Sequence, residues 1–190
     1  MASLLRPALT LFIALSLITG LAYPLLTTGI ARWVFPSQAQ GSLIERDGKT
    51  VGSSLIGQRF SDPGHFWSRP SATGPTPYNA AASSGSNLGP LNPALADAIR
   101  GRIDALHAAD PGNTATIPAD LIYSSASGLD PHISTAAAQY QAGRIARVRN
   151  VPIERVRQLI AEHSEDRLFG FLGEPRVNVL ELNLALDAVR

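Results

Sequence analysis

Residues 7–31 read PALTLFIALSLITGLAYPLLTTGIA, and this stretch of 25 residues contains no charged side chain. As a helix that rises about 1.5 Å per residue, it is long enough to cross the hydrocarbon layer of a bilayer, which is about 30 Å thick. Its polar side chains are hydroxyls, which can bond back to a helix carbonyl or to a neighbouring helix. The stretch therefore predicts one transmembrane helix near the N-terminus.

Two other interpretations of this stretch are less consistent with it. A secretory signal peptide has an apolar core of about 7–15 residues and a small-x-small cleavage site. The core here is longer, and its one weak cleavage candidate is Gly29-Ile30-Ala31. The buried core helix of a soluble domain rarely stays free of charge for 25 residues. A membrane span is the favoured interpretation.

Three residues of the span are candidates for packing against other helices. Ser16 and Gly20 form a small-xxx-small pair, which lets a second helix approach closely. Pro24 lacks a backbone N–H and predicts a kink in the helix. These side chains predict contact with membrane lipid and with larger membrane partners.

The charges that flank the span give its orientation. Arg6 and the amino terminus precede it, and Arg32 follows it together with the interfacial aromatics Trp33 and Phe35. Because loops that stay in the cytoplasm carry an excess of positive charge, we expect a cytoplasmic N-terminus. The domain after the span is then extracytoplasmic.

The composition bounds the rest of the chain. Residues 37–190 suit one compact domain, and residues 1–36 form the membrane anchor. The formal net charge of +1 gives no reason to expect nucleic acid, and the absence of cysteine excludes disulfides and thiolate metal sites. Lys49 is the single lysine, so the sequence offers only one candidate for covalent catalysis by a lysine. The expected fold class is α+β: one transmembrane helix followed by a single mixed, helix-rich soluble domain.

The first part of that domain is turn-rich. Asp47-Gly48 tolerates the backbone of a type I′ turn and predicts a hairpin over residues 42–56. Residues 61–93 are rich in proline and glycine, which excludes long helices. They also contain Trp67 and other aromatic residues, which disordered segments lack, so we expect a structured loop.

The remainder predicts helices. A helix capped by Asn92 runs from Pro93 to about Ala109, one capped by Ser134 reaches Arg149, and one capped by Asn150 covers Pro152 to His163.

The C-terminal region is harder to interpret. A short strand is expected within Glu165 to Gly173. Residues 177–189, VNVLELNLALDAV, fit both a strand and a helix, and Asn178 as a cap favours the helix.

Two clusters raise the question of chemistry. Asp130-Pro131-His132 places a carboxylate beside an imidazole, a pair able to bind a metal or to act as acid and base. Two ligands are too few for a metal site, and a turn is the favoured interpretation, so no metal is expected.

A serine hydrolase using Ser127 or His132 is the alternative function, although no G-x-S-x-G motif is present. The arginines between Arg144 and Arg157 suit a solvated face better than a phosphate site.

Seven motifs, taken in order, resemble one family. They are residues 19–24 (TGLAYP), 41–44 (GSLI), 52–58 (GSSLIGQ), 69–72 (RPSA), 85–90 (GSNLGP), 127–134 (SGLDPHIS) and 170–180 (GFLGEPRVNVL). Together they are similar to the KdpC family, the small single-span subunits of the bacterial Kdp potassium-transporting P-type ATPases. The departures are minor: Gln40 stands where asparagine is usual and Leu91 where threonine is common.

The resemblance implies an accessory role in the bacterial inner membrane. The partners would be the channel-like subunit, which carries potassium, and the P-type subunit, which hydrolyses ATP. The family is described as stabilising assembly and as a catalytic chaperone that raises the ATP affinity of the hydrolysing subunit, so ATP is an implied cofactor. Candidate partner contacts are Trp67, Arg69, Asn87, Asp130, His132 and Asn178.

The residues agree with a non-catalytic role. The chain has no D-K-T-G-T phosphorylation loop and no selectivity-filter sequence such as T-V-G-Y-G. A single span cannot enclose a pore. Potassium passage and phosphoryl transfer are therefore expected of other chains.

Overall fold

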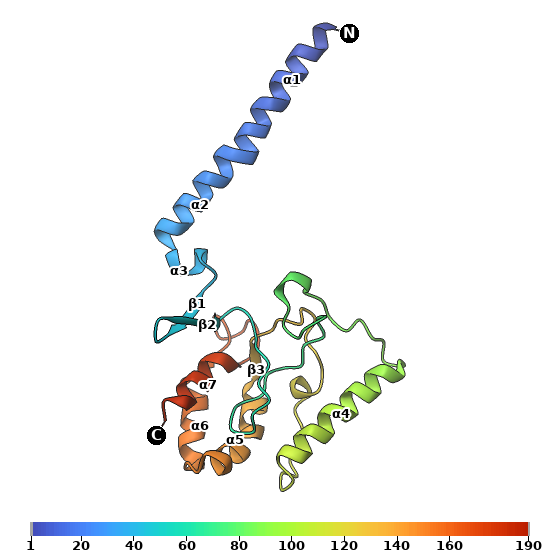
Figure 1. Cartoon of the computed structure of the whole chain (residues 1–190), viewed down its shortest axis with the longest axis vertical. Helices are drawn as coiled ribbons and strands as arrows, with labels where there is room; N and C mark the ends of the chain where they lie inside the picture. The colour runs from blue at the N-terminus through green and yellow to red at the C-terminus, as the bar shows by residue number, and fades with distance from the viewer. Residues whose placement is uncertain (1, 190) are drawn as a thin grey trace. The chain divides into compact units, whose positions relative to one another are not determined.

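The computed structural model describes residues 2–189 and divides the chain into two compact units, one ending at Val51 and the other starting at Gly52. The first unit contains α1 (Ala2–Leu17), the π-helical turn η1 (Ile18–Ala22), α2 (Tyr23–Val34), α3 (Pro36–Ala39), β1 (Leu43–Arg46) and most of β2 (Lys49–Ser53). The second unit holds the remaining helices and strands (Figure 1).

The N-terminal helix has the length and composition of a membrane span. From Leu4 to Val34 it runs for 31 residues, and none of this stretch is buried within the protein. The hydroxyl of Thr19 donates to the carbonyl oxygen of Leu15 at 2.8 Å, and that of Thr27 donates to Tyr23 at 2.9 Å. These bonds satisfy the hydroxyls within the helix, as a lipid environment requires.

Pro24 distorts the helix in the turn that precedes it. Because proline lacks an N–H and its ring crowds the carbonyl four residues earlier, an ordinary α-turn is unfavourable there. The structure widens this turn into η1, in which the N–H of Tyr23 donates to the carbonyl of Ile18, five residues back. The distortion expected from the sequence is thus a π-helical turn in an otherwise continuous helix.

The hairpin expected around Asp47-Gly48 is present. β1 and β2 form a two-stranded sheet, and the two turn residues have φ angles of 52° and 72°. Positive φ at both central positions is the requirement of a type I′ turn.

The second unit packs helices around a small antiparallel sheet. Its strands are β3 (His132–Ser134), β4 (Ser164–Glu165) and β5 (Arg176–Asn178), in the order β3-β5-β4. Its longer helices are α4 (Pro93–Ala109), α5 (Thr135–Arg149), α6 (Ile153–Glu162) and α7 (Val179–Asp187), and its 3₁₀ turns are η2 (Ala80–Ala82) and η3 (Ala119–Leu121). The α+β class predicted from the sequence is confirmed.

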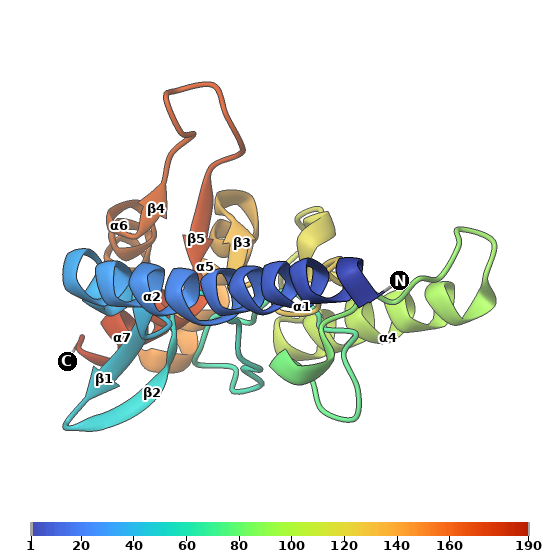
Figure 2. The ribbon, with the colours of Figure 1, turned by 90° about the horizontal axis from the view of Figure 1, so that it is seen from above.

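α5, α6 and α7 pack together, whereas α4 lies apart from them across the irregular segments (Figures 1 and 2). The core between the sheet and these three helices consists of aliphatic side chains that are at most 8% exposed: Ile133, Ala137, Ala138, Ala142, Ile145, Ala146, Val156, Leu159, Ile160, Val177, Val179, Leu182 and Leu186.

Three predicted helix starts are confirmed by their capping bonds. The side chain of Asn92 accepts a hydrogen bond from the N–H of Ala94, that of Ser134 from Ala137, and that of Asn178 from Glu181. The C-terminal segment, for which a helix was favoured over a strand, is helical from Val179, and β5 occupies the three residues before it.

The prediction that Asn150 caps the third helix is wrong. Asn150 instead ends α5, with a left-handed backbone at φ 54°, and the N–H of Val151 donates to the carbonyl of Ala146. Asparagine tolerates this conformation better than other residues with a side chain. α6 begins at Ile153, with Pro152 in the capping position.

The strand expected within residues 165–173 is almost entirely replaced by a turn. β4 covers only Ser164 and Glu165. Beyond it, Phe169, Gly170 and Gly173 all have positive φ, which no regular strand accommodates.

Amide side chains hold residues 61–69, which we call the irregular segment, onto the helices. Asn183 of α7 accepts from the N–H of Phe66 at 2.8 Å and donates to its carbonyl at 3.0 Å. Gln141 of α5 makes the same pair of bonds with the backbone of Trp67, at 2.7 and 3.1 Å. Each amide thus replaces the strand partner that the segment does not have, and the Phe66 ring is completely buried.

We predict that Asn183→Ala destabilises the second unit by about 2–4 kcal/mol, because it leaves a buried N–H and a buried carbonyl without partners. Urea unfolding of the full chain in detergent, followed by tryptophan fluorescence, measures the change. Gln158→Ala removes an exposed amide and is the matched control, with an expected change below about 0.5 kcal/mol. Equal unfolding midpoints for the two variants would contradict the role of Asn183.

Candidate functional site

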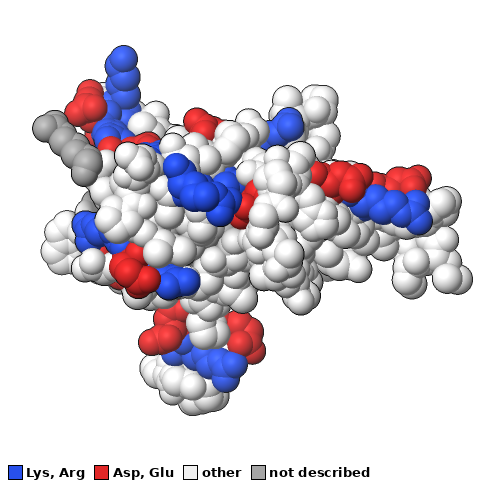
Figure 3. All heavy atoms as spheres, turned by 90° about the horizontal axis from the view of Figure 1, so that it is seen from below, with Lys and Arg blue, Asp and Glu red and all other residues white. Residues whose placement is uncertain are grey.

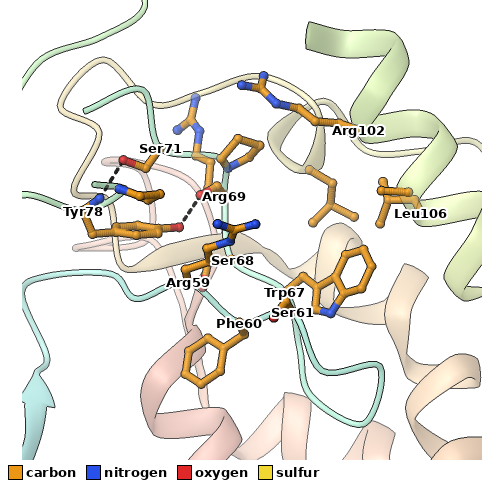
Figure 4. Close-up of a pocket in the computed structure, with 14 residues that line it drawn as sticks. Arg59, Phe60, Ser61, Trp67, Ser68, Arg69, Ser71, Tyr78, Arg102 and Leu106 are labelled. Carbon is orange, nitrogen blue, oxygen red and sulfur yellow. Dashed lines mark hydrogen bonds between the residues drawn. The ribbon is translucent and has the colours of Figure 1, made fainter. Parts of the chain in front are cut away.

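The second unit contains a cavity of about 370 Å³ beside the irregular segment (Figure 4). This volume lies in the lower part of the range of small-ligand sites. The lining comes from four places in the chain: residues 59–71, residues 77–78, α4 and η3. It consists of Arg59, Phe60, Ser61, Trp67, Ser68, Arg69, Pro70, Ser71, Pro77, Tyr78, Arg102, Ala105, Leu106 and Leu121.

The charge of the lining is all positive. It holds three arginines, Arg59, Arg69 and Arg102, and no carboxylate. Among the described residues, neither Arg59 nor Arg102 has a carboxylate oxygen within ion-pair distance. A partly enclosed site with unbalanced guanidinium groups favours an anionic ligand or an acidic side chain.

Arg102 is held in place by α4 and by the backbone opposite. Its Nη1 donates to the carbonyl oxygen of Ile122 at 2.5 Å, and burial lowers the pKa of its guanidinium. Ile99 and Leu106 lie three residues before it and four after it on the same helix face. The apolar stripe of the helix therefore directs this arginine toward the body of the unit, where its side chain is half-buried.

Arg69 is the one arginine of the lining that is ion-paired. Its Nη1 donates to Oδ2 of Asp130 at 3.0 Å, and both side chains are about 30% exposed. Burial opposes ionisation of Asp130, but the nearby imidazole of His132 and hydrogen bonds from the His132 backbone and from Arg69 outweigh it and lower the carboxyl pKa. Asp130 is therefore ionised at neutral pH and fixes Arg69.

Tyr78 and Ser71 shape the rim of the cavity. The Tyr78 hydroxyl donates to the carbonyl oxygen of Arg69, and its backbone N–H donates to Oγ of Ser71 at 2.9 Å. Burial, helped by the charge of Asp130 and opposed by the hydrogen bond with Ser68, raises the pKa of Tyr78 to about 12. The phenol thus stays protonated and serves as a donor that fixes the backbone.

Close backbone approach explains two glycines in the quoted motifs. A Cβ at Gly57 would lie 2.5 Å from the carbonyl oxygen of Asp130, and the N–H of Gly57 donates to Leu129 at 2.8 Å. Gly128 has φ 68°, and a Cβ there would lie 2.7 Å from the carbonyl oxygen of Ser84. Both positions let segments distant in the sequence lie close together.

The structure brings most of the predicted partner contacts into one neighbourhood. Trp67 and Arg69 line the cavity, Asp130 binds Arg69, and His132 is paired with Asn178 across β3 and β5. Asn178 also donates to the carbonyl oxygen of Ser54 at 2.8 Å. Asn87 is exposed, with φ 52°, in the loop after η2, and no interaction among the described residues joins it to this group.

The span residues Ser16, Gly20 and Pro24 lie on the exposed surface of the N-terminal helix. A Cβ added to Gly20 would meet nothing within 4 Å. This helix surface is therefore open to another helix.

Of the two residues of the alternative hydrolase, Ser127 lies in a bend and His132 is the first residue of β3. The Ser127 hydroxyl accepts the N–H of Leu129 at 3.1 Å, and Nδ1 of His132 lies 3.6 Å from Oδ1 of Asp130. Within residues 2–189, Ser127 and His132 make no hydrogen bond to each other, and no three His, Asp or Glu side chains gather to hold a metal ion. The geometry gives the hydrolase alternative no support.

Sequence reasoning missed Arg59 and Arg102. Arg102 had a detectable signal, because it falls on the apolar stripe of its helix at a spacing that faces the core. Arg59 had none, since its place beside the cavity depends on contacts of residues distant in the sequence.

Comparison with known proteins gives a consistent assignment. Residues 5–188 match the family model described as "KdpC: K+-transporting ATPase, c chain". The chain is 70% identical over 190 residues to the potassium-transporting ATPase KdpC subunit of Polaromonas naphthalenivorans, covering 100% of this chain and 97% of that protein. It is 67% identical over 188 residues to the KdpC subunit of Variovorax paradoxus, covering 99% and 97%, and 62% identical over 189 residues to that of Dechloromonas aromatica, covering 100% and 99%. The chain therefore belongs to the KdpC family, the c chains of potassium-transporting ATPases.

Proposed function

We propose that this chain is a non-catalytic accessory subunit that stabilises an ATP-driven potassium uptake complex and raises the ATP affinity of its hydrolysing subunit. The observation that carries the proposal is an apolar helix of 31 residues, unburied along its whole length, in a chain that belongs to a family of potassium-transporting ATPase subunits. Such a helix buries its surface against lipid and against the helices of other subunits.

The proposed topology follows from the charges around this helix. Residues 1–36 form the anchor, with the N-terminus in the cytoplasm, and residues 37–190 form one domain outside it, at the bacterial inner membrane. Arg6 and the amino terminus before the helix, against the single Arg32 directly after it, support this orientation.

The proposed partners are the P-type subunit that hydrolyses ATP and the channel-like subunit that carries potassium. Ser16, Gly20 and Pro24 are the proposed contacts within the membrane, because the small side chains allow close approach and Pro24 fixes a π-helical turn beside them. In the soluble domain the proposed contacts are Trp67, Arg69, Asn87, Asp130, His132 and Asn178, four of which line or support the cavity or its ion pair.

The resemblance implies ATP as a cofactor of the complex, and part of the cavity lining suits its phosphates. Arg59 and Arg102 fit phosphate oxygens by charge and by hydrogen bonding, and they would hold such a group there. In the proposed orientation, however, this cavity is separated by the membrane from cytoplasmic ATP. We therefore attribute the gain in ATP affinity to coupling: the subunit binds more tightly to the conformation of its partner that binds ATP better.

Assembly tests the proposed function directly. When the chain is co-expressed with the rest of its transport complex, we expect it to co-purify with two larger membrane proteins that mass spectrometry identifies as the channel-like and P-type subunits. The complex without the chain should bind ATP about 5–150 times more weakly, the usual range of coupling between sites. Isolation of the chain as a lone monomer would contradict the proposal.

A matched pair of variants localises the membrane contact within the same assay. Gly20→Leu should reduce the yield of the complex, because its side chain blocks close helix approach. Gly29→Leu is the control, since nine residues of an α-helix place it on roughly the opposite face. Equal yields from the two variants would reject the contact at Gly20.

Topology is checked with reporters fused after Arg190. An enzyme active only outside the cytoplasm should give signal, and one active only inside should be silent. The opposite result would place the cavity on the cytoplasmic side of the membrane, where ATP is present. The gain in ATP affinity would then be explained by direct contact of ATP with this subunit, and not by coupling through its partner.

The cavity is tested with inorganic pyrophosphate, by calorimetry on the full chain in neutral detergent. Arg102→Gln should weaken binding by about 10- to 100-fold, the value of a hydrogen bond with a charged group. Arg157→Gln is the control, because Arg157 pairs with Glu154 on an exposed helix face away from the cavity. Unchanged affinity in the Arg102 variant would show that the cavity does not select anions by charge.

A further inference from the structure

A projecting apolar turn joins β4 to β5 in the second unit. We call residues 165–176 the finger; Figure 2 shows it extending away from the body of the unit, beyond the sheet. Its tip consists of Leu168, Phe169, Phe171 and Leu172, with the two phenylalanines 78% and 71% exposed. Between residues 52 and 189, nine large apolar side chains are exposed, and these four lie within five consecutive residues. The tip is thus a concentrated apolar surface.

The finger is an ordered, hydrogen-bonded turn. Leu168 and Leu172 form an antiparallel bridge, with the N–H of Leu168 donating to the carbonyl of Leu172 at 2.9 Å and the reverse bond at 3.0 Å. Phe169 has a left-handed backbone at φ 55°, which is unfavourable for a bulky residue. The turn therefore holds both phenylalanines toward solvent at a conformational cost, which implies a role for their exposure.

The base of the finger carries charged side chains that form ion pairs with each other. Arg167 pairs with Glu174 at 2.7 Å, and Arg176 pairs with Glu165 at 2.8 Å. In the view from below, the projection shows red and blue atoms at its base and uncharged atoms at its end (Figure 3). With Asp166, the finger has three acidic and two basic side chains, a net charge of −1.

These charges argue against a lipid surface as the partner of the tip. Anionic headgroups attract unpaired lysine and arginine, and tryptophan and tyrosine are the aromatics enriched at the membrane interface. In the finger both arginines are paired, the net charge is negative, and neither Trp nor Tyr occurs. An uncharged apolar pocket on a protein is the better complement.

The area argues against a second copy of this chain. Two phenylalanines and two leucines bury on the order of 500 Å², because one aromatic side chain accounts for about 150–250 Å². A stable interface buries about 800 Å² on each partner. The tip alone is too small to hold a dimer, but it suffices as one anchor between subunits that a shared membrane already keeps together.

We propose that the tip of the finger inserts into an apolar pocket on another subunit of the potassium-transporting ATPase, as a hydrophobic anchor of the assembled complex. This inference rests on the proposed function and adds to it the surface that holds the partner. Burial of the two phenylalanine rings in a pocket makes them the dominant contacts of the interface.

Photo-crosslinking in the assembled complex tests this anchor. With p-benzoylphenylalanine in place of Phe171, irradiation should join the chain to one of its two larger partners, identified by mass spectrometry of the adduct. The same probe at Val148, which is 54% exposed on α5 and is not among the proposed partner contacts, is the control and should give at most a tenth of that adduct. An adduct with lipid, one with a second copy of this chain, or no adduct above the Val148 control would overturn the inference.

Substitution gives an independent measurement. The double variant Phe169→Ser and Phe171→Ser should lower the yield of the complex at least tenfold, and Phe169→Leu with Phe171→Leu should restore most of it. The unfolding temperature of the isolated full chain should not change, because the tip lies outside the core. If the wild-type chain co-purifies and the serine variant does so equally well, this inference fails alone; if the wild-type chain does not co-purify, the proposed function fails and this inference with it.

Discussion

The second unit depends on a buried arginine that has no carboxylate oxygen within ion-pair distance among residues 2–189. Arg144 of α5 is 2% exposed and donates to the carbonyl oxygens of Pro63 and His65 and, at 2.6 Å, to Oε1 of Gln141. The ring of Trp67 lies 4.8 Å from its guanidinium carbon. Burial lowers the pKa of Arg144 to about 10, so it remains charged at neutral pH. A buried charge is tolerated only when hydrogen bonds replace its hydration, and here the backbone carbonyls of the irregular segment do so.

This arrangement explains how a proline-rich segment comes to be ordered. None of the strands in the described part of the chain pairs with residues 61–69, so their backbone groups need side chains as partners. Arg144 takes two of the carbonyls, while Gln141 and Asn183 each take one N–H and one carbonyl. Because this segment also forms a wall of the arginine-lined cavity, the helices position the candidate site through it. The site and the core therefore share one set of polar contacts.

These long-range contacts could not be predicted from the sequence, whereas local ones could. Helix starts were predictable, because Asn92, Ser134 and Asn178 cap helices by bonds to residues two or three positions away. Asn150 was assigned to the wrong helix because asparagine suits both a start and a left-handed end, and only the path of the chain decides between them. Gln141 and Asn183 bind backbone 74 and 117 residues away, and no local pattern separates such an amide from an exposed one. The cavity was unpredictable for that reason, although two residues of its lining, Trp67 and Arg69, were singled out from the sequence as candidate partner contacts.

The distribution of apolar surface connects the two units to a single role. Within the second unit the core is closed by its own helices and sheet, so it needs no partner to bury its aliphatic residues. The apolar surface that remains exposed is concentrated in the N-terminal helix and, within the second unit, at residues 168–172. A water-soluble enzyme gains nothing from either, because exposed apolar area costs free energy in water. A subunit that must hold other membrane proteins gains from both, since lipid or a partner covers each surface on assembly.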